Sequence, residues 1–233
     1  MYDRGEPDDP QFLDRWDGGV GWIAHPDEGS RRASYAVRAD DGVWLFDPLD
    51  APGVDDRVTT LGDVAGVAVC SNWHARDAGA FARRYDVAVH VPAWMTRVAD
   101  RVDAPVERYR EVPGNSGFRV RRVDPLPGWR EGVAYREADG TLYAPDVLTA
   151  LPDATVGDER VGLALPCRLF PPREQLCDCD PERILVGHGS GVFRDADDAL
   201  ANVLDGARWR VPRALVRQGP TQVRGILGAV LDR

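Results

Sequence analysis

The stretch from residue 64 to residue 85 restricts the fold of this chain more than any other. Small apolar residues from Val64 to Val69 predict a buried strand, and the pattern from Ala78 to Tyr85 predicts a helix. The loop between them, residues 70–77, therefore carries ionisable side chains at the carboxyl end of a strand. α/β proteins usually form their sites at that edge of a sheet. The stretch predicts an α/β fold with a candidate site in this loop.

Two further predicted strands end in polar residues. Residues 141–144 form the second strand of a hairpin, and Asp146 follows them. Residues 183–186 read as a buried strand, and His188 follows in a Gly-His-Gly turn, in which the flanking glycines let the backbone turn sharply. Asp146 and His188 are therefore candidate site residues, although Asp146 could instead cap the segment that follows it.

The rest of the chain predicts two mixed sheets with helices outside them. Residues 1–17 are polar and rich in proline and aspartate, which predicts an N-terminal arm before a single domain at 18–233. Residues 150–181 are proline-rich with little periodicity and form either a pocket wall or a surface loop. Further strands are predicted at 18–25, 33–38, 43–47, 87–91, 118–123 and 132–137. Helices are predicted at 54–61, from Pro92 to Ala99, at 195–209 with Asp195 as the cap, and at 223–232.

Composition excludes several classes of function. The net charge is -9, which argues against nucleic acid as a partner. All 29 basic residues are arginine, and aspartate dominates the acids, a balance typical of a salt-loving organism, where salt screens the self-repulsion. No run of 18 apolar residues and no apolar leader is present, so we expect no membrane partner and a cytoplasmic location. The four cysteines, including the C-x-C of Cys177 and Cys179, are expected to be free thiols.

The layout of these motifs resembles the metallo-β-lactamase fold superfamily over about residues 18–210. The family's first motif, H-x-H-x-D-H after a strand, aligns here with Asn72, His74, Arg76 and Asp77. The family's P-G-H turn aligns with a Pro-Gly pair followed by Trp129, and its bridging aspartate and G-H-G turn align with Asp146 and His188. The early hairpin that ends at Asp47 also fits. The resemblance implies a four-layer αββα sandwich, with the four site loops meeting at one edge.

The departures from the family pattern imply a degraded dinuclear site. Asn72, Arg76 and Trp129 stand where the family has ligands, and we expect them to line the pocket instead. Arginine stays charged in proteins, so Arg76 would repel a second metal and pair with Asp77 or Asp146. Trp129 would fill the space of the first metal.

The remaining residues could hold one metal at most. The candidate ligands are His74, Asp77, Asp146 and His188, a set of nitrogen and oxygen donors that suits zinc, iron or manganese. Asp146 is also the catalytic candidate. Two readings stay open for His74, as a metal ligand or as a hydrogen-bond partner of Asp146, and Asp77 could instead be the N-cap of the helix.

Two functions follow from these alternatives. In the first, the protein is a hydrolase with one metal that acts on a small ester, thioester, lactone or phosphoester. In the second, it is a metal-free pseudoenzyme that binds a small molecule or a protein. Fold alone does not decide between them, because function depends on the site.

Overall fold

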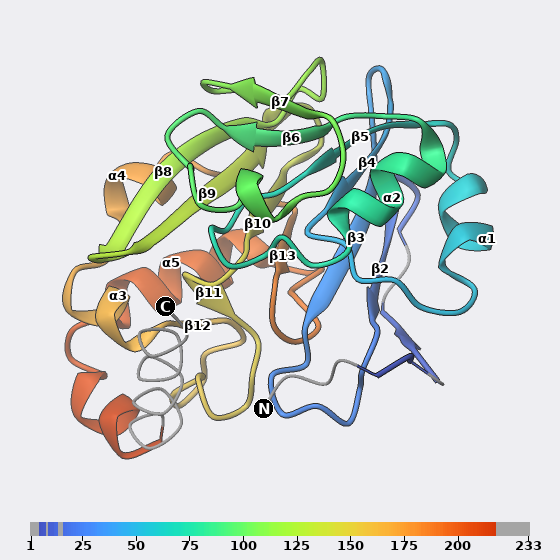
Figure 1. The fold of residues 1–233 in the computed structure, drawn as a ribbon. Coiled ribbons are helices and arrows are strands. Elements are labelled where there is room, and N and C mark those ends of the chain that lie inside the picture. Colours follow the sequence, from blue (N-terminus) through green and yellow to red (C-terminus); the bar gives the residue numbers. More distant parts are fainter. Residues whose placement is uncertain (1–4, 8, 14–15, 218–233) are drawn as a thin grey trace.

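The first sheet has seven strands and carries the first half of the chain (Figure 1). The structure is a computed structural model that describes residues 5–7, 9–13 and 16–217, so the helix predicted at 223–232 lies outside the described residues. In spatial order the strands are β1 (Gln11–Phe12), β2 (Gly19–Ile23), β3 (Ala33–Ala39), β4 (Gly42–Phe46), β5 (Val64–Ala68), β6 (Val89–Pro92) and β7 (Val106–Tyr109). The pairs from β1 to β4 are antiparallel, and those from β4 to β7 are parallel.

The second sheet has four strands and faces the first. In spatial order its strands are β13 (Arg183–Val186), β10 (Thr141–Ala144), β9 (Trp129–Arg136) and β8 (Arg119–Leu126). The β10–β13 pair is parallel, and the other pairs are antiparallel. A separate two-stranded sheet joins β11 (Leu148–Thr149) to β12 (Gly162–Leu163).

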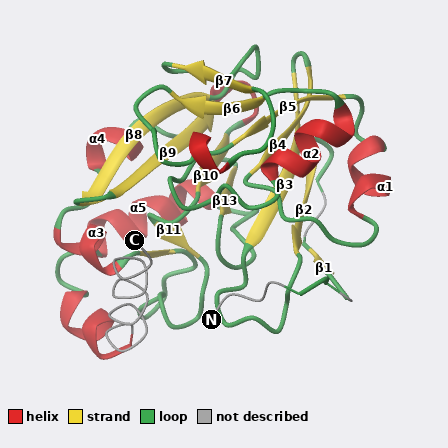
Figure 2. Cartoon of the chain, in the orientation of Figure 1, coloured by secondary structure: helices red, strands yellow, loops and turns green. Residues whose placement is uncertain are grey.

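Helices cover the outer face of each sheet, on opposite sides of the molecule (Figures 1 and 2). On the first sheet lie α1 (Val54–Thr59) and α2 (Ala78–Tyr85), and on the second lie α3 (Leu165–Leu169), α4 (Arg173–Leu176) and α5 (Ala196–Gly206). Short 3₁₀ turns occupy η1 (Ala99–Arg101) and η2 (Glu137–Asp139).

Three apolar cores separate the four layers. Phe81 of α2 and Val58 of α1 belong to the outer core of the first sheet, and Leu200 of α5 belongs to that of the second. Between the sheets, aromatic side chains dominate, with Phe46 of β4 against Tyr143 of β10 at a centroid distance of 5.2 Å. Burial of such large rings provides most of the driving force for closing a sandwich. The predicted αββα architecture is confirmed.

Several predicted elements differ from the structure. No helix starts at Pro92, which is the last residue of β6. Pro92 pairs with Tyr109 of β7, a strand that was not predicted from the sequence. A strand end tolerates proline because the missing N–H costs no ladder bond there. Residues 150–181 hold β12, α3 and α4 instead of loop alone. Asp195 precedes α5 but makes no side-chain cap bond, since its backbone adopts a left-handed conformation with φ 42°.

The predicted N-terminal arm forms an edge strand over part of its length. Phe12 in β1 pairs with Trp22 in β2, so this segment adds a short strand to the first sheet. None of the helices in the described part of the chain combines the length and apolarity that a membrane span requires. The four cysteines are free thiols, as expected.

Candidate metal centre

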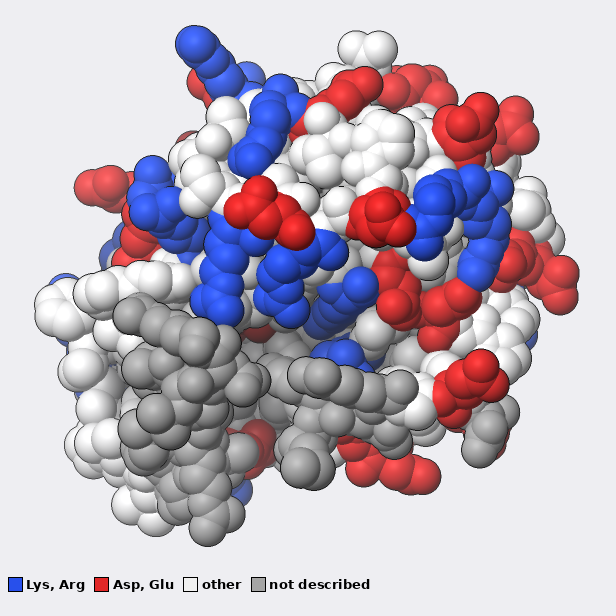
Figure 3. Space-filling view, in the orientation of Figure 1, with Lys and Arg blue, Asp and Glu red and all other residues white. Residues whose placement is uncertain are grey.

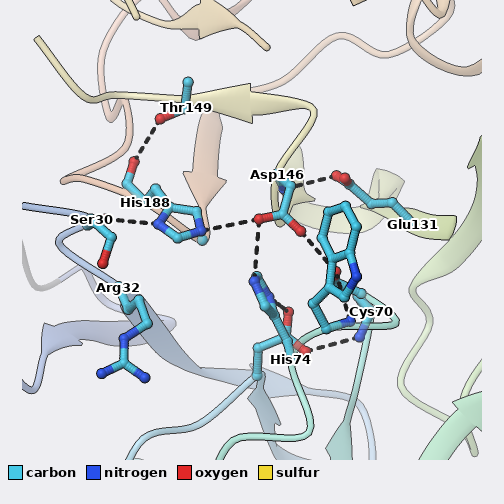
Figure 4. Close-up of polar contacts among 12 residues, drawn as sticks. Ser30, Arg32, Cys70, His74, Glu131, Asp146, Thr149 and His188 are labelled. Atoms are coloured by element: carbon cyan, nitrogen blue, oxygen red, sulfur yellow. Dashed lines mark hydrogen bonds and ion pairs between the residues drawn. The ribbon is translucent and has the colours of Figure 1, made fainter. Parts of the chain in front are cut away.

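Three strands deliver three ligand-type side chains to one place. His74, Asp146 and His188 lie in the segments that follow the carboxyl ends of β5, β10 and β13 (Figure 4). One ligand atom from each lies within 4.8 Å of the other two. The edge location follows from the topology, because β10 and β13 are parallel neighbours and end together. The order of the motifs predicts that these three residues converge, and in the structure they do.

Both histidines direct the same ring atom at the same oxygen. His74 Nε2 lies 3.2 Å from Asp146 Oδ1, and His188 Nε2 lies 3.0 Å from that oxygen. Ligand atoms that share a zinc ion at 2.0–2.2 Å lie roughly 3–4 Å apart, so these separations suit a common ion.

The other ring nitrogen of each histidine contacts an acceptor. His188 Nδ1 lies 2.7 Å from the carbonyl oxygen of Ser30, and His74 Nδ1 lies 3.0 Å from a carboxylate oxygen of Asp47. A carbonyl oxygen can only accept, so Nδ1 of His188 carries the hydrogen. In the neutral ring, Nε2 then presents a lone pair to Asp146. Two acceptors this close need a proton or a cation between them. Metal-binding histidines usually have the same orientation, with one ring nitrogen donating to an acceptor and the other facing the ion.

Charge effects at the centre favour an ionised Asp146. Burial alone raises the pKa of this carboxyl, but with a proton on each Nε2 the charge of His74 and the hydrogen bonds from both histidines outweigh it and hold the pKa well below its usual range. Burial and the charge of Arg76 lower the pKa of His74, yet Asp146 and the bond to Asp47 leave it raised. Ser71 Oγ donates to the second oxygen of Asp146 at 2.7 Å. Asp146 therefore keeps one oxygen for a ligand role.

Asp47 supports His74 from within the core, a role that the sequence analysis did not assign. Its carboxylate is fully buried and accepts hydrogen bonds from the Cys70 backbone N–H at 2.9 Å and from the Tyr143 hydroxyl at 2.5 Å. Its φ of 44° is unusual for a residue with a side chain and directs the carboxylate inward. The sequence located Asp47 at a hairpin end, but its partners come from two other strands.

Glu131 supports Asp146 in a similar way and was also not predicted. This buried side chain, in β9, accepts hydrogen bonds from the backbone N–H groups of Asp146 and Val147 and from the Trp129 indole. Burial, followed by the charge of Asp146, raises the pKa of Glu131 well above its usual value. Glu131 thus fixes the backbone that carries Asp146.

Arg76 does not make the ion pairs that the sequence analysis expected. Its guanidinium donates to the carbonyl oxygens of Ala33 at 2.6 Å, Asp47 at 2.8 Å and Gly187 at 3.3 Å, and no ion pair with Asp77 or Asp146 is present among the described residues. The loop backbone, with φ 40° at Arg76, turns the side chain toward these carbonyls. Arg76 therefore ties the loop after β5 to both sheets, with Nη2 3.5 Å from His74 Nε2.

Asp77 lies outside the group of three. Its carboxylate accepts the Asp50 backbone N–H at 2.7 Å, and it makes no cap bond to α2 although it precedes that helix. Asp77 therefore stands at the N-cap position of α2, as predicted, while its carboxylate anchors the loop after β4 and does not join the group of three.

The described contacts give Asn72 and Trp129 structural roles. The Asn72 amide donates to the Gly128 carbonyl at 2.8 Å and accepts the Arg130 backbone N–H at 2.9 Å, which clamps the loop after β5 to the β8–β9 turn. Trp129 is buried against Trp73, with ring centroids 5.2 Å apart. Trp129 thus packs where the resemblance implied a ligand.

The donor set fits a single divalent cation. Two imidazole nitrogens and one carboxylate oxygen converge, each ring is oriented by an acceptor on its far nitrogen, and this set suits zinc or iron with open positions. Asp77 does not supply a fourth protein ligand.

On the face drawn in Figure 3, arginine side chains gather near the middle and carboxylates lie around them.

Comparison with known proteins identifies the fold. No family model and no curated protein matches the sequence. Among solved structures, the DIM-1 metallo-β-lactamase exposed to ceftazidime aligns with 87% of this chain and 100% of its own, at 9% identity and a TM-score of 0.59. The mono-zinc form of the FIM-1 metallo-β-lactamase from Pseudomonas aeruginosa aligns with 87% and 98%, at 14% identity and 0.55.

A protein with a different name has the same architecture. A putative diflavin flavoprotein from Nostoc aligns with 88% of this chain and 99% of its own fragment, at 14% identity and a TM-score of 0.61. Identities this low establish shared fold and nothing finer about the reaction. Together with the two facing sheets and their outer helices, these matches show that the chain has the metallo-β-lactamase fold.

Proposed function

We propose that this protein is a hydrolase that uses one divalent cation, held by His74, Asp146 and His188. The observation that carries the proposal is the orientation of the two imidazoles, which direct Nε2 at one carboxylate oxygen while acceptors hold both Nδ1–H groups. When bound, zinc, iron or manganese would supply a Lewis acid and lower the pKa of a water molecule toward about 7.

The chain's own residues have distinct roles in this proposal. Asp47 and the Ser30 carbonyl keep each imidazole in the tautomer that leaves Nε2 as a donor of electrons. Glu131 holds the backbone of Asp146, and Ser71 occupies the carboxylate oxygen that faces away from the histidines. The reacting bond would belong to a small ester, thioester, lactone or phosphoester.

A second function has one specific observation in its favour. Nη2 of Arg76 lies 3.5 Å from His74 Nε2, and its fixed positive charge opposes a cation at that atom. If Arg76 takes the place of the ion, the protein is a metal-free module that binds a small molecule. The two candidates predict opposite results for metal content.

Elemental analysis of protein purified without chelators tests the proposal. We expect about one equivalent of zinc, iron or manganese, loss of that metal in His188→Ala, and its retention in His90→Ala, a matched control at a buried histidine of β6 outside the group. Metal removal should lower the melting temperature of the parent protein, because an ion that binds only the native state stabilises it. Less than about a tenth of an equivalent, with no shift on adding metal, would support the metal-free module.

An activity panel then tests the reaction. Model esters, thioesters, lactones, phosphodiesters and a β-lactam should be offered to the metal-loaded protein and to His188→Ala. Turnover that needs both the metal and His188 supports the hydrolase. Stoichiometric metal without turnover on any of the five classes would reduce the function to metal binding.

A further inference from the structure

A second feature of the molecule is an open hollow of about 360 Å³ at the opposite ends of the site-bearing strands. Arg183 is the first residue of β13, and His188 follows the other end of that strand. Arg38 lies near the end of β3, whose first residue, Ala33, lies beside the metal centre. Arg136, at the end of β9, completes a set of three arginines around the hollow. His74, Asp146 and His188 do not line it.

The arginines are held in place and retain donors. Asp139 anchors two of them, with Arg183 Nη1 at 3.2 Å and Arg136 Nη1 at 3.3 Å from Oδ2, and Asp40 binds Arg136 Nη2 at 2.6 Å. The described hydrogen bond of Arg38 uses only Nε–H, which donates to the Leu61 carbonyl at 3.0 Å. Anchoring by a shared carboxylate fixes a guanidinium without using all of its five N–H groups.

An aromatic wall completes the hollow. Trp16 is fixed by paired backbone hydrogen bonds with Gly19, and its ring covers that glycine so closely that a Cβ there would lie 2.3 Å from a ring carbon. The Arg183 guanidinium lies 5.8 Å from the Trp16 ring. Gly18 lines the hollow below the indole, where any side chain would crowd Trp16 Nε1 at 3.2 Å.

Unsatisfied donors mark the same residues. Trp16 Nε1 and Arg136 Nε are buried N–H groups with no hydrogen-bond partner among the described residues. Buried polar groups usually have partners, and these two exceptions belong to residues that line one hollow. The lining carries three arginines against Asp17 and Asp139, and Asp40 pairs with Arg136 from outside the lining.

We propose that this hollow binds a small oxyanion, a phosphate or carboxylate group carried on a flat ring. The guanidinium groups would bind the anion, as arginine does for both anions, and the Trp16 side chain would contact the ring at the wall of the hollow. The volume lies within the range of small-molecule sites. The proposal is independent of the metal centre, because none of its residues belongs to that group.

Calorimetric titration at constant ionic strength tests the proposal with three probes. Phenyl phosphate and benzoate offer the two anions on a ring, and inorganic phosphate offers the anion alone. We expect saturable binding of at least one ring probe, tighter than inorganic phosphate. Preference between phenyl phosphate and benzoate then identifies the anion.

Matched variants assign the probe to the hollow. Arg38→Gln and Arg183→Gln should each weaken binding on the order of tenfold or more, because each removes a charge-assisted bond. Arg122→Gln, an exposed arginine paired with Asp124, is the surface control, and His188→Ala is the control for the metal centre. Both controls should leave affinity unchanged.

Three results would overturn the proposal: no saturable binding of any probe, affinity unaffected by Arg38→Gln, or affinity lost in His188→Ala. Arg38 is exposed, so its variant tests the site even if Arg183→Gln fails to fold.

Discussion

Two regions of this molecule bury carboxylates and neutralise them differently. Near α3 and α5, Glu159 is fully buried between two arginines, with Arg168 Nη2 at 2.7 Å and Arg210 Nη1 at 3.1 Å. In the metal centre, Asp47 and Glu131 are equally buried. Among the described contacts, their carboxylates meet backbone N–H groups, a hydroxyl, an indole and a histidine, but no arginine side chain.

The difference separates a structural network from a site that attracts a cation. The arginines beside Glu159 carry a permanent positive charge that balances its carboxylate, so this region has no net negative charge to attract a metal ion. Around His74, Asp146 and His188, no arginine side chain meets the supporting carboxylates among the described contacts, and the pKa of Asp146 stays well below its usual range while burial raises that of Glu131. A buried carboxylate without a fixed countercharge favours a proton or a metal. Substitutions in each region test this contrast.

The largest effect is expected at Arg168. Replacing it by leucine removes one of the two arginines that bind Glu159 and leaves a buried charge undercompensated, so Arg168→Leu should lower the free energy of unfolding by about 3–5 kcal/mol. Denaturant unfolding measures the loss. Arg173→Leu, at a guanidinium that is half exposed, should change stability far less. Equal effects of the two variants would show that Glu159 does not depend on the pair.

Replacing Glu131 should have the next largest effect on stability. An amide cannot accept all the hydrogen bonds that this carboxylate accepts, so Glu131→Gln leaves at least one buried N–H of Trp129, Asp146 or Val147 unpaired. The expected loss of stability is about 1–3 kcal/mol, with weaker metal binding. Glu137→Gln in η2 is the exposed control. A neutral Glu131→Gln would mean that the segment carrying Asp146 holds its conformation without this carboxylate.

Asp47 and Glu131, the two carboxylates that support the candidate ligands, show which contacts the sequence does not predict. The segment bounds of α2, 78–85, were predicted correctly because apolar spacing along a helix is a local property. The positions of His74, Asp146 and His188 after strands were predictable for the same reason. The role of Glu131 depends on β9 pairing and on a loop from another strand, shown by the bridge between Ser71 and Glu131.

Other misassigned residues share this cause. Asp47 obtains Tyr143 and His74 as partners only when the two sheets face each other, and no spacing in the sequence encodes that contact. Asp77 precedes α2, as the local rule for helix caps predicts, but its carboxylate accepts the Asp50 N–H and makes no bond to the helix. Arg76 was expected to seek carboxylates, yet three backbone carbonyls converge on it after folding. Charge predicts which partners a residue can take, and tertiary structure decides which it meets.

Asp47 should matter for metal affinity more than for stability. In Asp47→Asn, an amide oxygen that accepts from the Cys70 N–H turns the amide nitrogen toward Tyr143 and His74 Nδ1–H, which share the other carboxylate oxygen, and a nitrogen donor cannot accept from either. We expect metal affinity to fall by about 10–100-fold, as for other partners that orient a ligating histidine. Competition against a chelator measures it, with Asp50→Asn as the control, because that side chain is 41% exposed and pairs with Arg84. Unchanged affinity would show that the bond from Asp47 does not set the orientation of His74.

The smallest change in stability is expected at Arg76, and it tests the contrast most directly. Its guanidinium satisfies backbone carbonyls, which retain a second lone pair, so Arg76→Ala should cost only about 1–2 kcal/mol. Removing the cation 3.5 Å from His74 Nε2 should at the same time tighten metal binding by about tenfold, since a like charge near the ion is lost. Denaturant unfolding with and without added zinc measures both effects.

The sign of the metal effect decides between the two functions. A variant that is less stable without metal and gains more stability from zinc than the parent would mean that Arg76 and the ion compete at His74. A variant that loses about 3–5 kcal/mol and binds no metal would instead identify Arg76 as the countercharge of Asp146, as Arg168 is for Glu159. In that case the two regions would share one strategy, and the metal-free module would be the better account of the site.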